Sequence, residues 1–201
     1  MKSDVLFEFD KVIRNASGEL LCGIDEAGRG PLAGPVVCAA VILQPNAVID
    51  GLDDSKRLSE KKRLSLYKTI LKVSIGIAVA MIHHEEIDRV NILNATMKGM
   101  RDAYSSLNVS PDFAIIDGNR LPEGLNNSRA IVKGDTLSAS IAAASIVAKT
   151  ERDQYMRKMD ALYPEYQFSK HKGYPTKLHY EMIDKYGVTP IHRKSFLKGR
   201  V

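Results

Sequence analysis

The sequence has few of the features that mark membrane-bound or secreted proteins. Only two cysteines, Cys22 and Cys38, occur in 201 residues, and neither belongs to a CxxC or Cys/His metal spacing, so we expect buried, reduced thiols. The longest apolar run, residues 141–148, is interrupted by Ser145 and is too short to cross a bilayer. Acidic residues break any signal-peptide core near the start. We therefore expect a soluble, cytoplasmic protein without a membrane anchor.

Internal repeats, low-complexity tracts and linkers are also absent. With 44% hydrophobic and 26% charged residues, the composition suits one globular core, so we expect a single domain over residues 1–201. The net charge of +5 is unevenly placed: residues 1–150 carry 18 basic and 18 acidic side chains, whereas residues 151–201 carry 11 and 6. A basic segment at about residues 164–201 could bind nucleic acid by neutralising phosphates, or could be an ordinary solvated surface.

Hydrophobic periodicity predicts alternating strands and helices, which indicates an α/β fold. The Ala/Ser-rich helix predicted at residues 137–162 would pack close to a sheet, and the basic, amphipathic helix predicted at residues 59–72 would cover the sheet with one face. The predicted strands are residues 20–24, 36–43, 73–82, 113–116 and 130–132. The predicted helices are residues 59–72, 85–107, 137–162 and 176–186.

The most informative motif is GIDEAGRGPLAGPVV, residues 23–37. Asp25 and Glu26 end an apolar segment and are followed at once by Gly28, Arg29 and Gly30. Carboxylates are preferred ligands of Mg²⁺ and Mn²⁺, glycines let a backbone approach a ligand, and arginine pairs with phosphate. The motif therefore favours metal-assisted chemistry on a phosphodiester, although such a pair before a glycine-rich bend is also typical of a solvated turn.

Two further acidic residues fall next to glycines at predicted element boundaries. Asp117 follows a strand in a DGN sequence, and Asp135 follows Gly134 before the long helix. Each has an ordinary alternative, as a turn residue or a helix cap. Gathered in one pocket, however, these carboxylates would repel one another unless cations lay between them. Two divalent ions would satisfy such a cluster and support phosphodiester hydrolysis.

Three other patterns carry less weight. The tract HHEE at residues 83–86 lacks the HExxH spacing of a metal helix, so we expect a capping and surface role. Ser55 and Lys56 resemble a nucleophile pair, but no third orienting group is identifiable. The spacing from Gly28 to Gly34 is GxGxxxG and a strand follows it, which argues against a dinucleotide loop.

Seven motifs follow one another along the chain: GIDEAGRGPLAGPVV, DSKRLS, NILNATM, IIDGN, VKGDTLSASIAAASIVAK, HKGYPT and HRKSF. In these motifs and their order, residues 21–196 resemble the bacterial ribonuclease HII family. One small departure is Arg57, where the family often has lysine.

This resemblance implies a ribonuclease H-like fold, a mixed sheet flanked by helices with a basic helical and loop segment at the C-terminus. It also implies a catalytic site that binds two Mg²⁺ or Mn²⁺ ions. The residues that match the four catalytic, metal-binding carboxylates are Asp25, Glu26, Asp117 and Asp135.

The resemblance further implies how substrate is bound. Gly28, Arg29 and Gly30 match a motif that senses the ribose 2′-hydroxyl, and Tyr174 matches a residue that packs on the adjacent deoxyribose. From the sequence alone, Tyr174 would instead be a loop aromatic. The basic residues of 170–172 and 192–194 are expected to contact phosphates, although basic runs are also typical of a solvated face.

The implied activity is endonucleolytic cleavage of the RNA strand of RNA–DNA hybrids. The resemblance also implies cutting 5′ of single ribonucleotides embedded in duplex DNA, which would serve ribonucleotide removal during DNA repair and replication. The expected ends are 3′-hydroxyl and 5′-phosphate. Type HIII carries an additional N-terminal substrate-binding domain, and about twenty residues before residue 21 leave no room for one, so we expect type HII. We also expect a monomer without an obligate protein partner.

Two other functions are open on the sequence. A proofreading exonuclease would also use four carboxylates, but two of them typically form an Asp-x-Glu pair, whereas Asp25 and Glu26 are adjacent. A non-enzymatic hybrid-binding module would use the same acids only as caps and turns.

Overall fold

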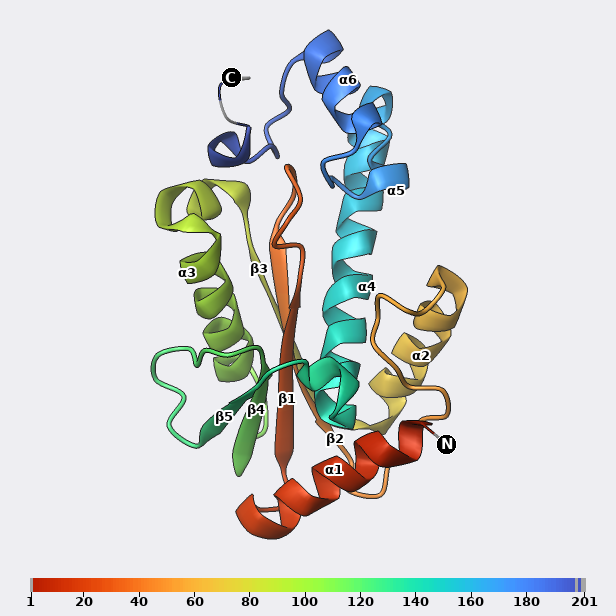
Figure 1. The fold of residues 1–201 in the computed structure, drawn as a ribbon, viewed down its shortest axis with the longest axis vertical. Helices are drawn as coiled ribbons and strands as arrows, with labels where there is room; N and C mark the ends of the chain where they lie inside the picture. Colours follow the sequence, from red (N-terminus) through yellow and green to blue (C-terminus); the bar gives the residue numbers. More distant parts are fainter. Residues whose placement is uncertain (1, 198, 200–201) are drawn as a thin grey trace.

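A five-stranded mixed sheet lies at the centre of the computed structural model, which describes residues 2–197 and 199 (Figure 1). The strand order is β3-β2-β1-β4-β5, with β1–β2 and β2–β3 antiparallel and β1–β4 and β4–β5 parallel. The predicted mixed α/β architecture is confirmed. The strands are β1 Leu21–Ala27, β2 Val36–Leu43, β3 Ser74–Ile82, β4 Phe113–Asp117 and β5 Ser128–Ile131.

All four predicted helices are observed, with ends that differ by at most two residues, whereas α1 and α5 were not predicted. None of the helices in the described part of the chain has the length and apolar character that a bilayer span requires. The α-helices are α1 Lys2–Ser17, α2 Glu60–Val73, α3 His84–Ser105, α4 Ala139–Leu162, α5 Phe168–His171 and α6 Lys177–Tyr186. Short 3₁₀ turns are η1 Gly134–Thr136, η2 Pro164–Tyr166 and η3 Lys194–Phe196.

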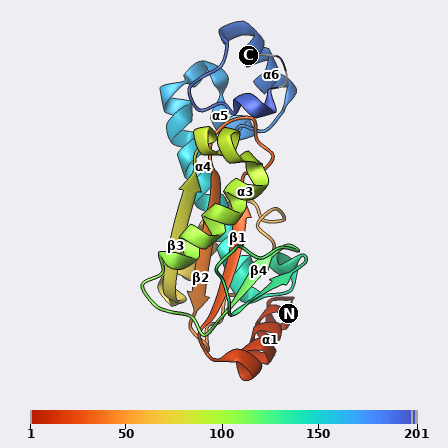
Figure 2. The same ribbon diagram turned by 90° about the vertical axis from the view of Figure 1, so that its left-hand side faces the viewer.

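Helices cover both faces of the sheet (Figures 1 and 2). On one face α3 packs residues such as Ile87 and Met100 onto the strands, and on the other α4 lies flat with α1 and α2 beside it. The alanines of α4 allow this helix to approach the sheet, as expected. The approach is so close that a Cβ on Gly23 of β1 would lie 2.1 Å from the carbonyl carbon of Ser140, so this position requires glycine.

Strand β1 runs three residues beyond its predicted end. Its pairing with β4 stops at Ile24, but its antiparallel pairing with β2 continues to Ala27. Asp25 and Glu26 therefore lie within a strand, and the expectation that they follow it was wrong. In the parallel register Ile24 faces Ile116, so Asp25 lies level with Asp117, the last residue of the neighbouring β4, and Glu26 lies one residue beyond it.

Residues 164–197, here called the C-terminal segment, pack at the end of the sheet, against the end of α4 and the loop between β1 and β2 (Figure 1). Backbone hydrogen bonds fasten it there: Leu32 N–H donates to Gly173 O at 2.8 Å, and Arg193 N–H donates to Leu32 O at 2.8 Å. Ala33 and His192 form an isolated antiparallel bridge. This docking places Tyr174 beside the glycine-rich loop, which is the loop of residues 28–35 between β1 and β2.

Candidate active site

Three carboxylates from distant parts of the chain meet at the end of the sheet. Asp25 comes from β1, Asp117 from the end of β4 and Asp135 from η1, and one oxygen of each lies within 4.8 Å of the others. The backbone N–H of Gly134 donates to Asp117 Oδ1 at 2.7 Å, which holds the η1 turn against β4. The predicted convergence is therefore present for these three residues.

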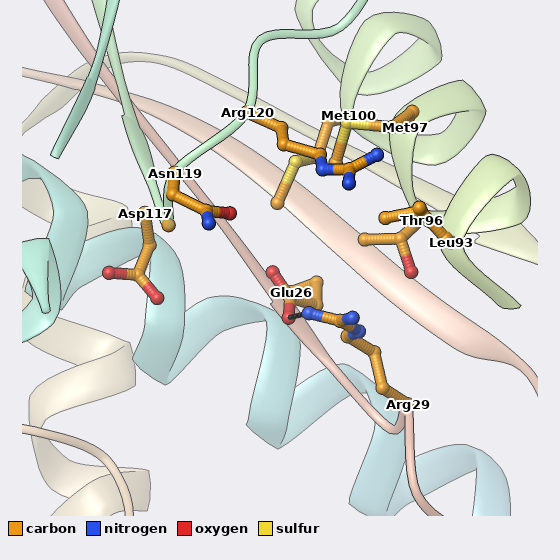
Figure 3. Close-up of a pocket in the computed structure, with 10 residues that line it drawn as sticks. Glu26, Arg29, Leu93, Thr96, Met97, Met100, Asp117, Asn119 and Arg120 are labelled. Atoms are coloured by element: carbon orange, nitrogen blue, oxygen red, sulfur yellow. Dashed lines mark ion pairs between the residues drawn. The ribbon is translucent and has the colours of Figure 1, made fainter. Parts of the chain in front are cut away.

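Glu26 neighbours Asp25 but is not one of the three converging residues. Its Oε1 lies 3.5 Å from Arg29 Nη1, and the pair borders a cleft of about 290 Å³ (Figure 3). Asp117 also lines this cleft, so the cleft reaches from the ion pair to the carboxylate group. The other lining residues are Leu93, Thr96, Met97, Met100, Gly118, Asn119 and Arg120.

The cluster of Asp25, Asp117 and Asp135 is electrostatically unfavourable without a counter-charge. Burial raises the pKa of Asp25 well above its usual range, and the neighbouring charges of Glu26 and Asp117 raise it further. Burial and then Asp117 raise the pKa of Asp135 in the same direction. A hard, all-oxygen donor set that resists ionisation fits a divalent cation such as Mg²⁺ or Mn²⁺.

A lysine and a buried serine pair support the group. Lys56 Nζ lies 3.9 Å from Asp135 Oδ2. Partial burial lowers the pKa of Lys56, but the surrounding carboxylates, Asp135 first, outweigh this effect and the net shift is upward. Ser55, the preceding residue, is buried with its Oγ 2.9 Å from Ser145 Oγ, so it does not pair with Lys56 as a nucleophile would.

We expect Mn²⁺ to stabilise the fold more at pH 8 than at pH 5. Because folding raises the pKa of Asp25, its protonated form favours folding at low pH, and this contribution is lost as the pH rises through the folded value. At pH 8 a bound Mn²⁺ takes the place of the Asp25 proton. At a 100-fold excess over its Kd it adds about 2.7 kcal/mol, or about 5–10 °C in Tm for a chain of this size. Thermal unfolding at both pH values measures this, and equal increments would contradict it.

Two buried arginines hold the glycine-rich loop by its backbone. Arg193 donates to the carbonyl oxygens of Gly28 at 2.7 Å, Arg29 at 2.9 Å and Gly34 at 2.9 Å. Arg152 donates to Ala33 O, Pro35 O and Lys172 O. Both side chains are fully buried, so their charges shape the loop instead of facing solvent.

This burial corrects part of the phosphate-contact prediction. His171, His192 and Arg193 are at most 7% exposed and bind backbone groups or, for His192, also the ring of His179, so they are not accessible to a phosphate backbone. Lys170 and Lys194 are exposed, and they remain candidates for that role. The basic excess of the last quarter is thus partly internal.

Tyr174 stands next to the glycine loop with 39% of its surface exposed. The guanidinium of Arg152 lies 5.6 Å from the centre of its ring, and Lys149 Nζ lies 5.8 Å from it. A Cβ added to Gly30 would lie 3.9 Å from Tyr174 Cε1 and would meet no other atom within 4 Å. The ring of Tyr174 therefore lies in van der Waals reach of the position that a Gly30 side chain would take, and no other group crowds that position.

Two capping interpretations are wrong. His83 occupies the N-cap of α3, but its side chain makes no capping hydrogen bond. Asp135 does not cap α4, because Ser138 fills that position and accepts from Ile141 N–H. Asp135 is consequently free of the ordinary role that the sequence allowed.

Solved structures share this fold. Ribonuclease H2 from Pyrococcus horikoshii matches with a TM-score of 0.75 at 27% identity, covering 90% of this chain and 95% of that one. Ribonuclease HII in a complex with PCNA from Archaeoglobus fulgidus matches with a TM-score of 0.73 at 25% identity, covering 87% and 94%. A ribonuclease HIII in complex with Mn²⁺ has the same fold at 20% identity, with a TM-score of 0.61 and coverage of 86% and 65%. Fold and site together define a nuclease with a ribonuclease H-like fold.

Sequence comparison makes the assignment specific. The family model for Ribonuclease HII matches residues 22–199. Ribonuclease HII of Vibrio parahaemolyticus is 56% identical over 178 residues, 89% of this chain and 84% of the relative, and that of Caldicellulosiruptor bescii is 49% identical over 193 residues, 96% and 94%. The chain belongs to the ribonuclease HII family. It is a metal-dependent endoribonuclease with ribonuclease H activity on RNA–DNA hybrids.

Proposed function

We propose that this enzyme cuts duplex DNA on the 5′ side of a single embedded ribonucleotide and leaves 3′-hydroxyl and 5′-phosphate ends. The observation that carries this proposal is the exposed ring of Tyr174 next to the backbone of Gly30, in the loop that directly follows the acidic end of β1. A sugar can pack on such a ring and contact the loop backbone without any base being read. Cleavage should therefore be independent of sequence.

Four carboxylates are proposed to hold the catalytic ions. Asp25, Asp117 and Asp135 already converge, and Glu26 would complete the set by leaving its exposed partner Arg29. Two divalent ions in that set, Mg²⁺ or Mn²⁺, would activate the attacking water and stabilise the leaving oxygen. The chain's own part is to hold the acidic oxygens in place.

The glycine loop is proposed to recognise the 2′-hydroxyl. Recognition by backbone atoms requires that the loop be rigid, since a mobile loop would accept deoxyribose equally well. Arg193 supplies this rigidity by occupying the carbonyl oxygens of Gly28 and Arg29. Tyr174 would then pack on the deoxyribose next to the ribonucleotide.

One chain supplies all of these parts. The carboxylates, the glycine loop and Tyr174 come from a single copy, and the C-terminal segment is fastened to the loop by hydrogen bonds. We therefore propose that the whole chain forms one catalytic domain that acts as a monomer. The binding of PCNA is a property of the Archaeoglobus protein.

The test is an end-blocked DNA duplex that contains one ribonucleotide, incubated with Mg²⁺ or Mn²⁺ in turn. We expect one internal nick 5′ of the ribonucleotide, a 3′-hydroxyl that a polymerase can extend, and no cutting of the all-DNA duplex. A strict requirement for a free end would instead indicate an exonuclease. Binding without cleavage in either metal would indicate a binding module.

A further inference from the structure

Three histidines form a buried stack in the C-terminal segment. His171 ends α5, His179 lies in α6 and His192 lies in the bridge to Ala33, and their exposures are 7%, 0% and 2%. The ring centres are 4.4 Å apart for His171 and His179 and 5.2 Å apart for His179 and His192. None of these rings reaches the carboxylates, so the chemistry of the site does not explain them.

Hydrogen bonds fix the protons on two of the rings. The backbone N–H of Thr189 can only donate, and both it and Thr189 Oγ1 lie 2.8 Å from His192 Nδ1, whereas Thr189 O is further away at 3.3 Å. The shorter contacts assign Nδ1 as an acceptor, which places the ring proton of His192 on Nε2. That proton faces His179 Nε2 at 3.0 Å, which must accept it. The proton of His179 is therefore on Nδ1, where it donates to the carbonyl oxygen of Tyr174 at 3.0 Å. The chain of bonds is complete only when both rings are neutral.

His171 holds the adjoining peptide. The N–H of Gly173 donates to His171 Nδ1 at 3.2 Å, and the opposite ring nitrogen lies 2.9 Å from Tyr166 O. The carbonyl of Gly173 in turn accepts from Leu32 N–H in the glycine loop. Gly173, the residue before Tyr174, is thus held by the ring of His171 through its N–H and by the glycine-rich loop through its carbonyl.

Burial keeps the rings in the required state. It lowers the pKa of His179 and of His192 to about 4, and it lowers that of His171 as well. The charged groups that act on the stack are Asp160 and Lys172 near His171 and His84 near His192, besides the rings themselves. At neutral pH the stack is uncharged.

We propose that His179, oriented by His192 and braced by His171, is a positioning residue that sets the height of Tyr174 over Gly30 and so favours cleavage at an embedded ribonucleotide. The proposal rests on the proposed role of Tyr174 as a sugar platform. The side chain of Tyr174 is partly exposed, so its own packing does not fix it. Its backbone does: the N–H donates to His171 O at 2.8 Å, and the carbonyl accepts from Thr176 N–H at 2.9 Å and from the ring of His179 at 3.0 Å. Of these partners, His179 is the one that holds Tyr174 through a side chain. A misplacement of about 1 Å is enough to cost about 10²-fold in rate.

The central experiment compares His179→Leu with His179→Asn on the single-ribonucleotide duplex. Leucine fills the space without a donor, whereas the asparagine amide nitrogen can take the place of Nδ1 and donate to Tyr174 O. We expect kcat/KM to fall about 10- to 100-fold with leucine and to recover most of that loss with asparagine. The exposed His83→Leu serves as the matched control and should retain full activity.

A double-mutant cycle with Tyr174→Ala separates the two proposals. If His179 acts through Tyr174, His179→Leu will have no further effect in the Tyr174→Ala background. Full activity of Tyr174→Ala alone would remove the proposed platform. If Tyr174→Ala is impaired and the loss of activity in the double variant equals the product of the two single losses, only the positioning role of His179 is overturned.

A spectroscopic measurement covers the case in which His179→Leu does not fold. Ring nitrogen NMR of the unmodified protein at pH 7 should show His179 with its proton on Nδ1 and His192 with its proton on Nε2. A proton on Nε2 of His179 would break the bond to Tyr174 and would overturn the proposal without any variant.

Discussion

Asp25→Asn is expected to slow cleavage of an RNA–DNA hybrid by at least about 10²-fold, because removal of one preorganised electrostatic group slows kcat by about 10²- to 10³-fold. Asparagine keeps the shape of the side chain but removes one charge from the group formed with Asp117 and Asp135. It also introduces an N–H donor among oxygens that are proposed to coordinate the same cation. Single-turnover cleavage with saturating Mg²⁺ or Mn²⁺ measures the effect.

Binding should survive this change. The phosphate backbone supplies most of the affinity for nucleic acid, and removing an acidic charge near it does not weaken that attraction. Fluorescence anisotropy at fixed salt should therefore give a Kd for the hybrid within about threefold of the unmodified enzyme. Asp50→Asn, on an exposed loop, is the matched control for both measurements. Cleavage at the unmodified rate by Asp25→Asn would reject the role assigned to this carboxylate.

Local sequence patterns predicted the parts of the fold that local forces determine. Strand β2 was predicted without error because all eight of its residues are apolar and buried on both faces. The end of β1 was misplaced, since Asp25 and Glu26 look like loop residues and stay in the strand only because β2 pairs with them. Helix α1 was missed because charged residues are interspersed along it and a single apolar side chain, Leu6, is fully buried in the core.

The candidate site shows the same division. The acidic motifs were recognisable because each lies in a short, distinctive run of residues. The clamps on the glycine loop were not, because Arg152 and Arg193 bind carbonyls more than 110 residues away and nothing in their neighbourhoods marks them as buried. A basic run is usually solvated, and only the tertiary structure shows which of its members turn inward.

Gly28→Ala is expected to remove most cleavage activity and to destabilise the fold by about 2–4 kcal/mol, the range of severe local strain and overpacking. Gly28 has φ of +97°, which L side chains rarely adopt. An added Cβ would lie 2.0 Å from Nε of Arg152 and 2.8 Å from the carbonyl oxygen of Pro35. Arg152 cannot move aside without releasing three backbone carbonyls, so the loop itself must shift.

Gly30→Ala makes the same chemical change two residues further on and should have a different outcome. Its backbone is not left-handed, and its Cβ would meet only Tyr174, at 3.9 Å, so the Tm should stay within about 2 °C of the unmodified protein. The methyl group would nevertheless stand beside the ring of Tyr174, where the sugars are proposed to bind, and should raise KM for the embedded ribonucleotide. Thermal unfolding and steady-state cleavage of both variants test this contrast. Equal stability of the two would show that Arg152 does not constrain the loop, because only Gly28 meets it.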